Sequence, residues 1–79
     1  MLITLTKNWK PVTAVDVLVQ KRGPGKVYLT HSDGIPIVDI SETFCVETSE
    51  VLNLPSIGVL TLWARSTTDG EVDLVATEV

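Results

Sequence analysis

Short stretches in which apolar and polar residues alternate recur along the whole chain, with turn-forming residues between them. The clearest are residues 2–6, 13–20, 26–30, 43–47, 59–66 and 71–79. Alternation with a period of two puts successive side chains on opposite faces of a β-strand, and the 3.6-residue period of an amphipathic helix is missing. The pattern therefore predicts an all-β protein: a compact antiparallel β-sandwich or small barrel of seven to eight short strands.

Two pairs of neighbouring stretches predict local hairpins. Residues 13–20 and 26–30 flank a Gly-Pro-Gly turn, and residues 59–66 and 71–79 flank a short Asp-Gly loop. Turn residues of this kind between two alternating runs are typical of antiparallel hairpins.

Alternation also gathers apolar side chains on one face of each stretch, which we expect to face the core. These residues are Val15, Val17 and Val19, Val27 and Leu29, Phe44 and Val46, Leu60, Leu62 and Ala64, and Val72, Leu74 and Ala76. Two segments are less regular. Residues 35–39 are a short extended piece interrupted by Pro36, and residues 51–55 fit either a short strand or a loop.

The stretch 59–66 carries the strongest functional signal. If Leu62 faces the core, Val59, Trp63 and Arg65 point away from it and form an outer patch. Trp and Arg are enriched at the energetic centres of protein interfaces. The alternative is that Trp63 points inward and closes the core.

Trp9 has the same ambiguity as Trp63. Its place beside a turn favours a role as a lid on the core.

A chain of 79 residues, 44% hydrophobic and 20% charged, predicts one domain spanning residues 1–79. A core of this size is marginal and usually needs a further source of stability. The chain has one cysteine, Cys45, and one histidine, His31, which excludes a disulfide within the chain and a structural zinc site. Oligomerisation or docking on a larger surface is the remaining common solution.

The net charge of −4 is unevenly spread. Residues 1–26 hold five basic residues and one acid, hence +4, whereas residues 27–79 hold one arginine and nine acids, hence −8. Such polarity can guide subunit docking, or it can be ordinary solvated surface charge. The chain has no basic stripe for nucleic acid and no apolar run long enough to cross a bilayer. Its first residues lack a basic segment ahead of an apolar stretch, so we expect that they are not a signal peptide.

No group of residues in the sequence forms a convincing reactive centre. His31-Ser32-Asp33 contains the residue types of a hydrolase triad, but adjacent side chains on an extended chain diverge. Cys45 has no base tied to it and is better explained as a small hydrophobe. Acid pairs such as Glu71 and Asp73 lack the spacing of a calcium loop. We therefore predict no enzyme activity, no catalytic or metal-ligating residues and no cofactor.

Three motifs carry a resemblance to a known group of proteins. They are Ile3-Thr4-Leu5-Thr6 with Trp9, the segment 17–29 (Val-Leu-Val-Gln-Lys-Arg-Gly-Pro-Gly-Lys-Val-Tyr-Leu), and Trp63-Ala64-Arg65-Ser66 followed by Asp69-Gly70 and Val75-Ala76-Thr77-Glu78. With these motifs, nearly the whole chain resembles the small accessory virion proteins encoded by tailed bacteriophages and prophages.

The resemblance implies a capsid decoration or cement protein, made in the host bacterial cytoplasm and located on the capsid surface of the virion. Its implied partners are the phage major capsid protein and itself, as a homo-oligomer; analogy with other shell-decorating proteins suggests a trimer. Alternatives are another virion component (head–tail joining, tail or fibre protein) or a carbohydrate-binding β-module.

The candidate interface residues include an extended N-terminal segment. Residues 1–11 are expected to contact a neighbour by pairing along an exposed strand edge. The individual candidates are Trp63, Val59, Arg65, Lys7, Trp9, Lys10 and Arg22.

Overall fold

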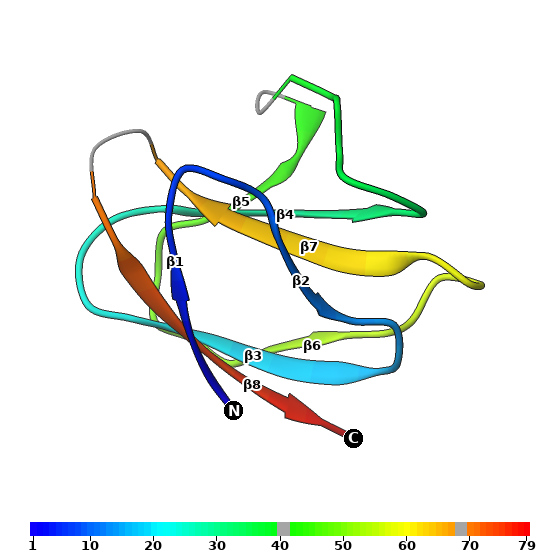
Figure 1. Cartoon of the computed structure of the whole chain (residues 1–79). Coiled ribbons are helices and arrows are strands. Elements are labelled where there is room, and N and C mark those ends of the chain that lie inside the picture. The colour runs from blue at the N-terminus through cyan, green and yellow to red at the C-terminus, as the bar shows by residue number, and fades with distance from the viewer. Residues whose placement is uncertain (40–41, 68–69) are drawn as a thin grey trace.

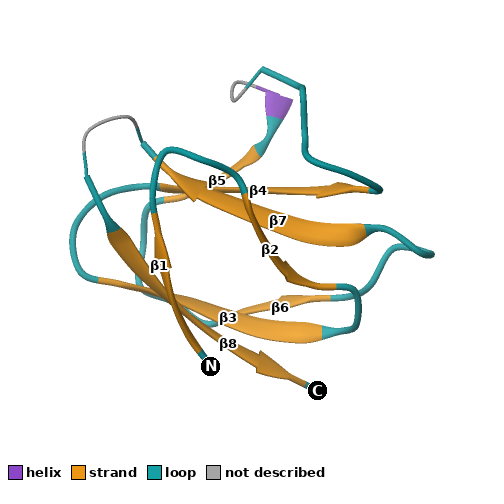
Figure 2. Ribbon diagram, viewed as in Figure 1, coloured by secondary structure: helices purple, strands orange, loops and turns teal. Residues whose placement is uncertain are grey.

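Eight short strands form where β-branched and other apolar residues alternate with polar ones. The computed structural model describes residues 1–39, 42–67 and 70–79. Its strands are β1 (Leu2–Leu5), β2 (Lys10–Thr13), β3 (Val17–Arg22), β4 (Val27–Ser32), β5 (Phe44–Val46), β6 (Leu52–Leu54), β7 (Thr61–Ser66) and β8 (Val72–Glu78). The all-β prediction is confirmed, and Figure 2 shows the strands packed in two layers.

The strands form two four-stranded sheets in which every pairing is antiparallel. The first sheet has the order β1-β8-β3-β6 and the second the order β2-β7-β4-β5 (Figure 1). Thus β1 pairs with β8, β2 with β7, β3 with β6 and β4 with β5, as in one long antiparallel ribbon bent at the β4–β5 connection and rolled up. Eight strands arranged in this way are a jelly roll.

The rolled topology means that neither predicted hairpin forms. β3 and β4 lie in different sheets, and so do β7 and β8. Asp69 of the predicted Asp-Gly loop lies outside the described residues. The physical reason is that each of these strands has one apolar face. An arch across the sandwich sets the two apolar faces opposite each other, whereas a hairpin would set them side by side. Alternation along the chain is the same in both cases.

The space between the sheets is filled by thirteen aliphatic side chains. They are Ile3, Leu5, Val12, Val17, Val19, Val27, Leu29, Val46, Leu62, Ala64, Val72, Leu74 and Ala76. Two packed sheets lie roughly 10 Å apart, and the shortest dimension of the Cα trace is 17 Å. None of the four aromatic residues of the chain belongs to this core.

Most of the predicted inward residues are buried, but three are not. Val15 is exposed because β3 begins only at Val17, and Phe44 is 56% exposed because β5 is an edge strand. Leu60 precedes β7 and is half-buried. The segment 35–39 forms no strand, whereas the ambiguous segment 51–55 contains β6.

Two polar residues sit at one end of the core. Lys21 continues the inward face of β3 and is only 4% exposed, and its Nζ donates to the carbonyl of Gly23 (2.6 Å). Ser66 is fully buried, and its hydroxyl donates to the carbonyl of Gly70 (2.6 Å). These hydrogen bonds satisfy the buried donors and hold the β3–β4 and β7–β8 connections against the end of the sandwich.

The N-terminal segment 1–11 is built into the domain. β1 pairs with β8 and β2 pairs with β7, and the carbonyl of Thr6 between them accepts a hydrogen bond from the Ser66 N–H (2.8 Å). The segment therefore closes one side of the sandwich (Figure 1). The predicted contact with a neighbour stays a prediction, and it would have to use the outer edges of these strands.

Gly25 provides a test of the β3–β4 arch. Its φ is +108°, and a Cβ there would lie 2.7 Å from Cγ2 of Val72. We expect Gly25→Ala to lower the free energy of unfolding in urea by about 1–3 kcal/mol, because backbone strain and overlap combine. Gly34→Ala is the matched control, since a Cβ at Gly34 meets nothing within 4 Å. Equal effects of the two substitutions would contradict the arch.

Asp16 gives a second test, through pH. The Ser56 backbone N–H donates to Oδ1 of Asp16 (2.7 Å), and this hydrogen bond, with a further one from the Ser56 side chain, lowers the pKa of Asp16 below its ordinary 3.8. A lowered pKa stabilises the fold above the ordinary value, and the effect is lost as pH falls through the folded-state value. Wild type should therefore exceed Asp16→Asn in urea midpoint at neutral pH, and the difference should shrink below about pH 4. A difference that persists in acid would be inconsistent with this hydrogen bond.

Candidate protein-binding surface

The outer face of the second sheet carries three of the four aromatic side chains. Trp63 on β7 lies opposite Pro11 on β2, and Arg65 lies opposite Tyr28 on β4. Trp9 precedes β2 and lies against Arg65. We call Trp9, Pro11, Tyr28, Trp63 and Arg65 the aromatic face.

Hydrogen bonds and a cation–π contact hold three side chains of the aromatic face, those of Trp9, Trp63 and Arg65. The Cζ of Arg65 lies 5.9 Å from the centroid of the Trp9 ring, within the range of a cation–π interaction. Arg65 Nε donates to the Ser66 carbonyl (3.1 Å), and Trp63 Nε1 donates to the Ser32 carbonyl (3.3 Å). Trp9, Trp63 and Arg65 are half-buried, so each is ordered by the monomer and still partly accessible. Ordered Trp and Arg side chains of this kind lose little entropy on binding a partner.

The structure decides the two questions that the sequence left open. Trp63 points away from the core, because Leu62, Ala64 and Ser66 of β7 are the buried residues. The place of Trp9 beside a turn had suggested that it covers the core, but the structure shows that it does not. Pairing of β2 with β7 carries it instead to the outer face, where it packs on Arg65.

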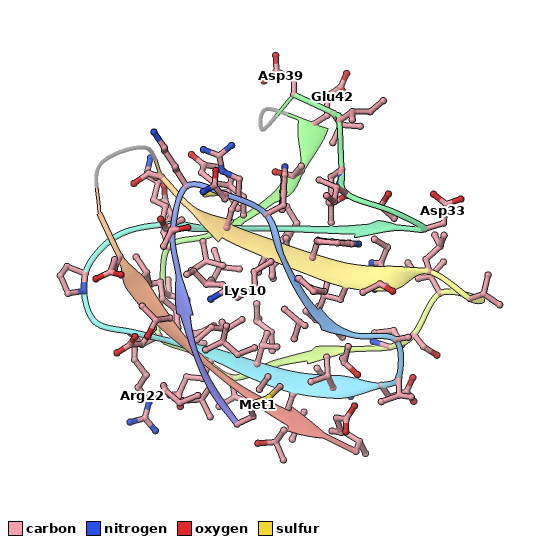
Figure 3. All side chains as sticks on the ribbon, in the orientation of Figure 1. Met1, Lys10, Arg22, Asp33, Asp39 and Glu42 are labelled. Atoms are coloured by element: carbon pink, nitrogen blue, oxygen red, sulfur yellow. The ribbon has the colours of Figure 1, made fainter. Side chains whose placement is uncertain are left out.

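The other four predicted interface residues lie elsewhere. Val59 is 90% exposed in the β6–β7 connection, because β7 begins only at Thr61. Lys7 is exposed between β1 and β2. Arg22 is exposed on β3 of the first sheet, and Lys10 reaches between β1 and β2, where its Nζ donates to the Thr4 carbonyl at 3.0 Å (Figure 3). The structure thus gathers only Trp9, Trp63 and Arg65.

A second apolar surface was not predicted from the sequence. The connection between β4 and β5 exposes Ile35, Ile37 and Val38, with Ile37 98% exposed. We call these three residues the apolar loop. The neighbouring Pro36 is buried, which anchors the loop. The signal in the sequence was an apolar run next to a proline, which fits a short strand equally well.

Acidic residues border the apolar loop. Asp33 lies at its start, and Asp39 and Glu42 lie at its far end (Figure 3). An apolar centre with a charged rim is the usual composition of a protein-binding patch.

The described residues contain no cluster of three or more His, Cys, Asp and Glu side chains that could hold a metal ion. His31 lines a cavity of about 200 Å³ together with Leu29, Thr30, Phe44, Leu54 and Leu62. That lining offers His31 no acid or thiol partner. In the same described ranges, no helix is long and apolar enough to cross a membrane.

Comparison with known proteins identifies no relative of this chain. No protein-family model, no curated protein and no solved structure matches it. Its function therefore has to be inferred from its own surface.

The two faces of β7 provide a matched test. Leu62→Ala removes a core side chain and should cost about 2–5 kcal/mol of unfolding free energy. Trp63→Ala, one residue along, should cost less than about 2 kcal/mol, because it removes only outer-face contacts. Urea unfolding of both variants measures the difference. Equal costs would place Trp63 in the core.

Proposed function

We propose that this chain is a structural, non-enzymatic subunit that binds other protein subunits. Its proposed site of action is the outer surface of a tailed-phage capsid, where it decorates and stabilises the shell. The observation that carries the proposal is the apolar loop: three large aliphatic side chains within four consecutive residues, with Ile37 almost fully exposed. Contiguous exposed apolar residues with a polar rim mark interaction sites.

The chemistry of the apolar loop favours protein as the partner. Covering one such aliphatic side chain contributes about 1.5–3 kcal/mol. When several apolar loops bind one particle, avidity raises the overall binding strength, so each single contact can be weak. On a shell, the loop would insert between neighbouring capsid subunits, and the aromatic face would supply a second, ordered contact. Assembled shells would then be bound and free subunits would not.

Two further considerations support the virion setting. Jelly rolls are common in viral capsid and lectin domains, which is an analogy at the level of fold. The sequence motifs that resemble small phage virion proteins point the same way. The carbohydrate-binding alternative gains no such support, because neither tryptophan lines the cavity beside His31, the groove beside β5 or the cavity beside Leu18.

Co-sedimentation with purified capsids of the phage that encodes the chain tests the proposal. We expect the wild-type chain to sediment with assembled capsids but not with dissociated capsid subunits. Ile37→Asp should weaken capsid binding at least about tenfold, since it removes the burial of one large aliphatic side chain.

Val15→Asp is the matched control, because Val15 is also exposed but lies in the β2–β3 connection. It should bind as wild type does. No sedimentation of the wild-type chain would refute the capsid role, and density along the tail in particle images would assign it to the tail instead.

A further inference from the structure

Each sheet of the sandwich ends in two edge strands, and these differ in how they are protected. The edges are β1 and β6 in the first sheet and β2 and β5 in the second. An unprotected edge presents unpaired N–H and C=O groups that accept another strand. Proteins block this with lysine, proline or a bulge at the edge.

The edges of β1 and β2 are blocked in these ways. The Nζ of Lys10 occupies the Thr4 carbonyl of β1 (3.0 Å). On β2, Pro11 lacks an N–H, and the pairing shifts register between Pro11 and Thr13.

The edge of β6 is limited by Pro55, which directly follows the strand. Met1 and Ala76 exchange both backbone hydrogen bonds (2.8 Å each), so Ala76 faces β1. In antiparallel sheets the direction of these groups alternates along each strand. Following this alternation from β8 through β3 to β6 shows that the backbone groups of Asn53 and Pro55 face the open edge. Proline has no N–H to offer a partner strand.

The same alternation shows which backbone groups of β4 face β7 and which face β5. The Ser66 N–H donates to Thr6, so Ser66 faces away from β4 and the adjacent Arg65 faces β4. Arg65 is paired with Tyr28, so the backbone groups of Tyr28 face β7. The neighbours of Tyr28 on β4 therefore face β5.

It follows that the backbone groups of Cys45 face the open edge. Cys45 lies opposite Tyr28, whereas Phe44 and Val46 lie opposite Leu29 and Val27 and bond to β4. β5 carries neither lysine nor proline. Its edge borders a groove of about 380 Å³ that runs from Phe44 to Leu52, and Phe44 is 56% exposed beside it.

We propose that β5 pairs antiparallel with β5 of a second copy about a twofold axis through Cys45. The second sheet of one copy and the second sheet of the other then join into one sheet of eight strands. Backbone groups of this edge require an extended strand as occupant, and a twofold pair must be self-complementary.

The sequence of β5 meets that requirement. With Cys45 on the axis, Phe44 lies opposite Val46 of the second copy, a favourable aromatic and β-branched pair that covers the exposed ring. Glu47 lies opposite Thr43 of the second copy, so no like charges meet. Glu47 is also neutralised by Lys26, whose Nζ lies 3.1 Å from its Oε1, and this contact raises the pKa of Lys26.

Sedimentation equilibrium of the purified chain tests the pairing. Wild type should dimerise to twice the chain mass of 8.6 kDa. Cys45→Pro removes an N–H that the monomer does not use, and should weaken dimerisation at least about tenfold through two lost intersubunit hydrogen bonds. Cys45→Lys keeps the N–H but sets two ammonium groups opposite each other, and should also weaken it.

Two controls separate edge pairing from general damage. Asn53→Pro makes the equivalent change on the β6 edge, and Cys45→Ser keeps a small neutral side chain; both should dimerise as wild type. Circular dichroism checks folding, and Cys45→Lys decides the outcome if Cys45→Pro does not fold. A monomeric wild type, the trimer expected by analogy, or undiminished dimerisation of a folded Cys45→Pro or Cys45→Lys variant would each overturn the proposal.

The biological purpose of the dimer rests on the proposed subunit-binding role, but the existence of the dimer does not. The dimer is measured without capsids, and Ile37→Asp should still dimerise. Loss of dimerisation and loss of capsid binding are therefore separate results.

Discussion

The narrow space between two four-stranded sheets is the constraint on which the rest of the structure depends. In the described residues its buried apolar side chains are Ile, Leu, Val and Ala, with Lys21 and Ser66 at one end, and this suits a layer roughly 10 Å thick. Trp9, Tyr28, Phe44 and Trp63 consequently lie outside the core, on the outer face or at the edge of the second sheet. A chain of 79 residues that leaves all of its aromatic area outside retains a large capacity to bind other protein surfaces.

Alternation along the sequence predicted which side chains fill this layer and could not predict how the strands are ordered. Val72, Leu74 and Ala76 were assigned correctly because a period of two fixes faces whatever the partner strand is. The turn at Gly25 was misjudged because a hairpin and an arch have the same local pattern. Trp63 and Arg65 followed from alternation, given an inward Leu62. Trp9 joins them only through the β2–β7 pairing, a long-range contact with no local signal.

Edge protection gives a structural role to residues that the sequence presented only as candidate contacts or turn residues. Lys10 stays a candidate partner contact, and its ammonium also donates to a carbonyl on the β1 edge. Pro11 and Pro55 remove donors at the β2 and β6 edges. With the β1 and β2 edges blocked and the β6 edge limited by Pro55, β5 is the edge at which we propose that sheet pairing continues. The apolar loop, which precedes β5 in the chain, would stay available for a different partner. Self-association and shell binding would therefore use adjacent but separate surfaces.

The central claim is that association covers surface that the thin aliphatic core leaves outside. It is tested most directly by the urea midpoint of the wild-type chain, measured over about two orders of magnitude in protein concentration. If folding and association are linked, the midpoint rises with concentration, because the associated state is favoured by mass action. A midpoint that stays constant over the whole range would contradict the account, because the chain would then fold to full stability alone.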